Sequence, residues 1–150
     1  SGYDDVVFMV STNPGAAPGA LHKIASGGEM SRFMLALKVI MAEREAHSKT
    51  MIFDEVDSGI GGATADAVGQ RLQTLAQMHQ ILVVTHSPQV AAKARNHFIV
   101  MKQGGDTIQT TVKPLPDESD RREEIARMLS GSDVTEQARA AAQTLMKTGS

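Results

Sequence analysis

The stretch Thr50–Glu55 reads TMIFDE, an apolar segment that ends abruptly in two carboxylates. A short apolar run of this kind is typical of a buried strand. A second such segment, Gln80–His86 (QILVVTH), ends in polar residues. In open α/β sheets, ligands bind beyond the carboxyl ends of the strands. The two segments therefore predict strands of one sheet with a functional site at their ends.

The rest of the sequence places helices between and after these strands. Residues 5–10 favour a strand, and a Pro/Gly/Asn loop follows to about Gly19. We expect helices from about Met30 onward, at about 63–78, 121–129 and 134–146, and a short one within 87–94, with a hairpin over 97–113. Ser87 should cap the helix that Pro88 opens, and Ser132 or Asp133 should begin the last helix. This order predicts a single domain over residues 1–150 of the α/β class: a partly parallel sheet with flanking helices and a late β-hairpin.

The composition narrows the function classes. Lys and Arg number 15 against 17 Asp and Glu, so the formal charge is -2 and no global basic field marks the chain as a nucleic-acid binder. The chain has no cysteine, which excludes disulfides and thiolate metal sites. No apolar run approaches the roughly 20 residues that span a bilayer. We expect a cytoplasmic protein that does not enter a membrane.

The stretch Ala25–Arg32, ASGGEMSR, allows two interpretations. Ser26 followed three residues later by Glu29 fits a capping box, which only starts a helix. A capping box does not require Gly27 and Gly28, each of which costs about 1 kcal/mol relative to Ala inside a helix. Bare backbone at a helix N-terminus is also suited to hold a phosphate, because its unpaired N–H groups and the helix dipole attract anions.

The strand-end residues are candidates for phosphate chemistry. Asp54 and Glu55 point differently because they are adjacent, so one can support a divalent metal while the other orients and deprotonates a water. His86 has no second histidine at ligand spacing, so we expect it to donate a hydrogen bond to a phosphate oxygen or to the attacking water rather than to bind metal. A solvated strand end and an incidental imidazole are the alternatives.

Taken in order, ASGGE, MIFDEVDSG and ILVVTHSP resemble the signature loop, the Walker B strand with its D-loop, and the H-loop of an ABC-type ATPase. Longer stretches around these motifs are similar to the C-terminal head segment of the RecN family, bacterial SMC-like DNA repair ATPases. These stretches are KIASGGEMSRFMLALK, IFDEVDSGIGG and THSPQVAAKA. STNPG and REEIARMLSG fit the same family, so the resemblance covers nearly the whole chain. It implies the C-terminal lobe of an ABC/SMC-type P-loop ATPase head.

The resemblance also implies residue roles. Asp54 matches the aspartate that supports Mg²⁺, and Glu55 matches the glutamate that polarises the attacking water. His86 would sense the γ-phosphate of ATP, and Asp57 would reach across a dimer interface. The signature residues would face the nucleotide bound to the opposite head: Ser26, Gly27, Gly28 and Glu29. Ala25 stands where ABC ATPases usually have Leu, a departure that leaves the phosphate-facing residues intact.

A larger departure is that nothing in the sequence fits the P-loop pattern G-x-x-x-x-G-K-[ST]. The resemblance places that loop in an N-terminal half of the same protein, beyond a long coiled coil, so the expected partners are that half, a second head in a homodimer, and DNA through the full-length protein. We expect ATP turnover in the full-length protein but not from this segment alone. The implied role is repair and recombination of DNA double-strand breaks, in a nucleoid-associated protein.

Two other interpretations stay open. Transporter ATPases typically carry Gln after SGG and an Arg-rich helix start, and Glu29 with MSRFMLALK differs from both. A non-catalytic dimerisation module could keep the fold, but it would have no reason to keep Glu55.

Overall fold

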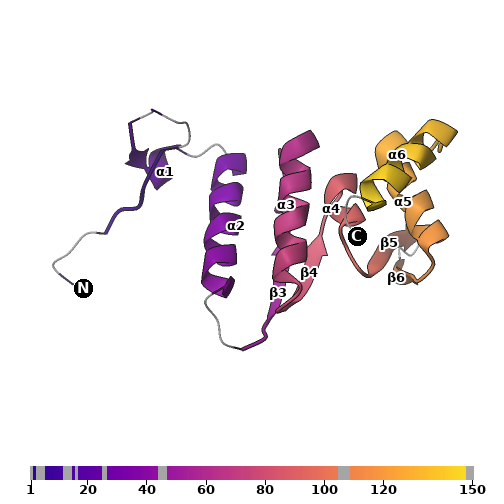
Figure 1. Cartoon of the computed structure of the whole chain (residues 1–150), viewed down its shortest axis with the longest axis horizontal. Coiled ribbons are helices and arrows are strands. Elements are labelled where there is room, and N and C mark those ends of the chain that lie inside the picture. The colour runs from indigo at the N-terminus through magenta and orange to yellow at the C-terminus, as the bar shows by residue number, and fades with distance from the viewer. Residues whose placement is uncertain are drawn as a thin grey trace.

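The computed structural model describes residues 2, 6–11, 15, 17–24, 27–43, 47–104 and 109–147, with only the backbone at 22, 24, 27–29, 31–32, 43 and 103. Its strands are β1 (Met9–Val10), β2 (Gly19–Ala20), β3 (Thr50–Asp54), β4 (Gln80–Val84), β5 (His97–Gln103) and β6 (Gln109–Leu115). Its helices are α1 (Leu21–Ile24), α2 (Gly27–Glu43), α3 (Gly62–Leu75), α4 (Pro88–Ala92), α5 (Glu118–Ser130) and α6 (Glu136–Lys147). Figure 1 shows these elements following one another along the long axis of the molecule.

The centre of the chain is a parallel strand pair, as the sequence predicts. β3 and β4 pair residue for residue from Thr50 with Gln80 to Asp54 with Val84, and α3 makes the crossover between them. The predicted α/β class, with a parallel pair and a late hairpin, is confirmed. Both strands therefore end at the same edge, which is the position a shared site needs.

The two faces of this pair differ sharply. The inner face carries Phe53, which is 1% exposed, and packs with buried residues of α2, α3 and α4. These residues are Leu35, Val39, Ala42, Val68, Leu72, Leu75 and Val90. On the outer face Ile52 is 66% exposed and Val84 57% exposed. One face of the pair is thus a core, while the other is apolar and uncovered by the described residues.

The C-terminal part forms a second core from small side chains. Ala92 of α4 packs with Ile125 and Ala126 of α5 and with the alanine-rich face of α6. The guanidinium of Arg139 on α6 holds Glu123 on α5 through two hydrogen bonds of 2.8 Å. The hairpin β5–β6, antiparallel from His97 with Leu115 to Gln103 with Gln109, lies next to these helices (Figure 1).

The structure corrects two boundaries. Neither Ser132 nor Asp133 starts α6, because the Thr135 hydroxyl accepts the N–H of Ala138 at 3.1 Å and caps the helix instead. Of the strand expected over 5–10, the structure describes residues 6–10, and within these only Met9–Val10 form a strand, paired with β2. Position 5 lies outside the described residues.

Candidate functional site

The site is built on the shared carboxyl edge of β3 and β4. Beyond the last strand pair, the N–H of Glu55 donates to the carbonyl of Val84 at 3.1 Å, so the two loops leave the sheet side by side. Asp54, Glu55 and His86 are all exposed at this edge. The parallel register therefore brings together two loops that lie 30 residues apart in sequence.

Glu55 has an unusual backbone. Its φ is +49°, the one positive φ of a non-glycine residue among those described. This left-handed conformation costs an ordinary L-residue roughly 1–2 kcal/mol. The chain then turns tightly, as the N–H of Ser58 donates to the Glu55 carbonyl at 3.0 Å. Strain of this kind often accompanies functional positions, because it directs a side chain that a relaxed strand would not.

Asp57 lies inside the chain and is 1% exposed. Its Oδ2 accepts the Thr85 hydroxyl and, at 3.1 Å, the N–H of Ser87. Its Oδ1 is buried and has no partner among the described residues. The resemblance implies that Asp57 reaches across a dimer interface, which stays a prediction. Within this chain the carboxylate joins its own loop to the loop that carries His86.

Ser87 ends this second loop and begins α4. Its hydroxyl accepts the Val90 N–H at 3.4 Å, and Pro88 occupies the first turn, where its missing N–H costs nothing. The predicted cap is confirmed. The segment Thr85–Ser87 is therefore fixed by Asp57 on one side and by the start of α4 on the other.

The start of α2 lies at the same end of the molecule. A shallow pocket of about 190 Å³ is lined by Met30 and Met34 of α2 together with Phe53–Val56. Gly27 and Gly28 are the first two residues of α2, one turn before Met30. Ala25 and Ser26 lie outside the described residues, as do the side chain of Glu29 and its capping-box bond. The signature glycines thus begin the helix that lines this pocket together with the strand-end carboxylates.

The open carboxylates suit a hard cation. Among the described residues, no group of three or more His, Asp or Glu could hold a metal by itself. Mg²⁺, however, is usually held by one or two carboxylates together with substrate phosphates and water. Asp54 and Glu55, exposed at the pocket rim, provide donors of that type.

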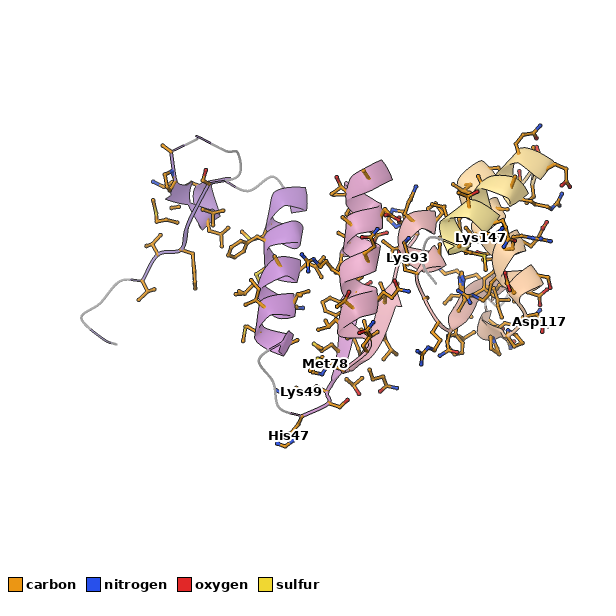
Figure 2. All side chains as sticks on the ribbon, in the orientation of Figure 1. His47, Lys49, Met78, Lys93, Asp117 and Lys147 are labelled. Atoms are coloured by element: carbon orange, nitrogen blue, oxygen red, sulfur yellow. The ribbon has the colours of Figure 1, made fainter. Side chains whose placement is uncertain are left out.

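Sequence reasoning missed the residues that support this edge. Thr85 was not singled out, nor was the ion pair in which Lys93 Nζ lies 2.9 Å from Asp66 Oδ1. The side chain of Lys93 is 2% exposed, and Figure 2 shows it beside α3 and α4. A lysine directly after a short buried helix was the available signal, but its partner on α3 could not be identified without the fold.

Comparison with known proteins places the sequence. The chain is 50% identical over 147 residues to the DNA repair protein RecN of Rickettsia felis, covering 97% of this chain and 27% of that protein. It is 49% identical over 147 residues to RecN of Xylella fastidiosa (98% and 26%) and 44% identical over 147 residues to RecN of Halalkalibacterium halodurans (97% and 26%). The chain therefore spans about a quarter of the length of the curated relatives it matches. No family model matches it.

The fold has a solved counterpart. A chain from work on ATP-driven dimerisation and DNA-stimulated activation of SMC ATPases superposes with a TM-score of 0.52 at 18% identity, covering 83% of this chain and 81% of that one. At this identity the match concerns the fold alone. No described helix is long and apolar enough to cross a membrane. The resemblance inferred from the motifs is thus confirmed: over nearly its whole length the chain is similar to a part of RecN proteins, and its fold matches that of a solved chain from work on SMC ATPases.

Proposed function

We propose that this chain supplies the signature, Walker B, D-loop and H-loop half of an ATPase head in a RecN-like protein of DNA double-strand break repair, working in the bacterial cytoplasm at the nucleoid. ATP would lie between two heads, bound by the P-loop half of one and by the signature segment of the other. The observation that carries the proposal is that Asp54, Glu55 and His86 all lie at the carboxyl ends of the paired strands β3 and β4.

Each residue has a distinct task in this proposal. Asp54 would hold Mg²⁺, which neutralises phosphate charge when bound. Glu55 would accept a proton from the attacking water, and its left-handed backbone turns it away from the strand line. His86 would donate to a γ-phosphate oxygen, and the signature residues Ser26–Glu29 would present N–H groups and the positive end of α2 to the nucleotide of the other head.

The exposed outer face of β3–β4 is further support for a P-loop half that packs against this chain. Parallel sheets occur almost only with both faces covered. Here β3 and β4 pair only with each other among the described strands, and Ile52, Leu82 and Val84 are exposed on one face. A P-loop half from elsewhere in the protein would add strands at the open edges and cover this face. This accounts for the expectation that the segment alone does not turn over ATP.

The test is ATP hydrolysis by the full-length protein with Glu55→Gln, which keeps shape and removes the base. Loss of general-base catalysis typically lowers turnover by about 10²–10⁴-fold, and ATP-bound dimers should persist longer. Asp120→Asn, an exposed carboxylate on α5, is the matched control and should leave turnover unchanged. An inactive wild-type protein, or a Glu55→Gln protein that hydrolyses ATP normally, contradicts the proposal and favours the non-catalytic dimerisation module.

A further inference from the structure

We propose that Asp57 is a positioning residue that acts within its own chain by fixing the segment Thr85–Ser87, and through it His86. This inference rests on the proposed function, since it takes His86 to face the nucleotide. It assigns the D-loop carboxylate a role different from reaching into a partner head.

The contacts of Asp57 surround His86 on both sides. One carboxylate oxygen accepts the hydroxyl of the preceding residue, Thr85, and the backbone N–H of the following residue, Ser87. The Ser87 N–H also approaches the Thr85 hydroxyl at 2.9 Å, so the three groups form one compact cluster. A buried carboxylate is a strong acceptor, which makes this a firm link between loops that are 30 residues apart.

The helices that follow the two loops are joined as well. Lys93, just past α4, pairs with Asp66 of α3. Gly69 of α3 lets the helices approach so closely that a Cβ there would lie 2.9 Å from Lys93 Cγ and 3.3 Å from the carbonyl oxygen of Gln89. Because both the loops and their helices are connected, a shift of the loop after β3 must carry the histidine segment with it.

The burial of Asp57 argues against a role in a partner head. At 1% exposure its carboxylate cannot contact another molecule without leaving Thr85 and Ser87 and opening the turn. Its second oxygen has no partner among the described residues, so an amide in place of the carboxylate could keep the accepting oxygen where it is. Asn is therefore the conservative replacement at this position.

The experiment measures steady-state ATP hydrolysis by the full-length protein with Asp57→Ala, Asp57→Asn, Thr85→Val and His86→Ala, and by the double variant with Asp57→Ala and His86→Ala. Loss of hydrogen bonds to a charged group predicts that Asp57→Ala lowers kcat by about 10–100-fold with little change in KM. Asp57→Asn should recover most of that loss, and Thr85→Val should reproduce part of it. The double variant should be no slower than His86→Ala alone.

Three outcomes overturn the inference. Multiplicative losses in the double variant would mean that Asp57 acts independently of His86, as a contact with a partner head would. A change in KM without a change in kcat would also contradict it, and so would a normal kcat in both Asp57→Ala and Thr85→Val. Thr85→Val keeps the carboxylate and decides the matter if Asp57→Ala fails to fold.

A second readout separates this inference from the proposed function. Deuterium exchange at the Ser87 amide reports the Asp57 contact without any turnover. If wild-type protein does not hydrolyse ATP, the proposed function fails, while faster Ser87 exchange in Asp57→Ala would still show the link between the loops. Unchanged exchange in that variant would refute the link itself.

Discussion

Substitutions of Glu55 can separate the strain of its backbone from the chemistry of its carboxylate. We compare Glu55→Gly with Glu55→Ala, which both remove the carboxylate and differ only in their tolerance of a positive φ. At φ +49° Ala retains a strain of roughly 1–2 kcal/mol that Gly relieves. Gly gives back about 0.5–1 kcal/mol through its greater freedom in the unfolded chain. The Gly variant should therefore be the more stable by about 0.5–1 kcal/mol.

The assay is thermal unfolding of the full-length protein, where such a difference shifts the midpoint of the head transition by about 1–4 °C. Both variants should hydrolyse ATP about 10²–10⁴-fold more slowly than the wild type, because neither has the carboxylate. Ser58, in the same loop and without a positive φ, provides the control. There the order should reverse, with Ala more stable than Gly. If Ala is the more stable at both positions, Glu55 is not strained and the reasoning is wrong.

Three further predictions concern the supporting structure. Gly69→Ala should lower stability by about 1 kcal/mol in the same unfolding assay, since crowding against Lys93 and α4 outweighs the gain in helix propensity; a stabilised variant would contradict the close approach. Asp66→Asn should cost roughly 1–3 kcal/mol, less than a fully buried pair because the Asp66 side chain is 30% exposed, and an unchanged midpoint would show that Lys93 does not need its carboxylate. Burial, reinforced by Arg121 and opposed by Glu124, lowers the pKa of His97 from its usual 6.5. The unfolded chain thus binds the proton more readily than the folded one, so stability should fall as the pH drops below about 6.5. His97→Gln should flatten that part of the profile of stability against pH. An unchanged profile would mean that another group causes the fall.

Much of the fold could be predicted because its signals are local. Apolar runs ending in polar residues located β3 and β4, and their connection through one helix indicated a parallel pair. The start of α6 could not be decided locally, since Ser132, Asp133 and Thr135 are all good caps. Thr135 is the residue that caps α6, because only this start lets Ala138 and Ala142 face α5.

The site divides in the same way. Residue types at the strand ends identified Asp54, Glu55 and His86, because strand ends expose whatever follows an apolar run. The direction of Asp57 could not be predicted, since it depends on the left-handed turn at Glu55 and on a threonine from another strand. Sequence resemblance assigned Asp57 a role, but only the packing of two loops shows where its carboxylate lies.

The outer face of β3–β4 gives a final prediction about assembly. Ile52 is 66% exposed in this chain, so Ile52→Ser should hardly change the stability of the segment itself. If the P-loop half covers that face, the same change removes a buried side chain worth about 1.5–3 kcal/mol from the joined head. The dissociation constant between separately produced halves should then rise by about 10–100-fold.

Met78→Ser is the matched control, because Met78 is 57% exposed but lies after α3, outside β3–β4 (Figure 2). Titration calorimetry of the two halves measures both variants. Asp54 is on the same outer face as Ile52. Docking of the P-loop half on this face would therefore bury Ile52 and bring the P-loop half to Asp54 in the same step. Equal affinities for Ile52→Ser and the wild type would mean that the P-loop half docks elsewhere, and that this exposed face requires a different partner.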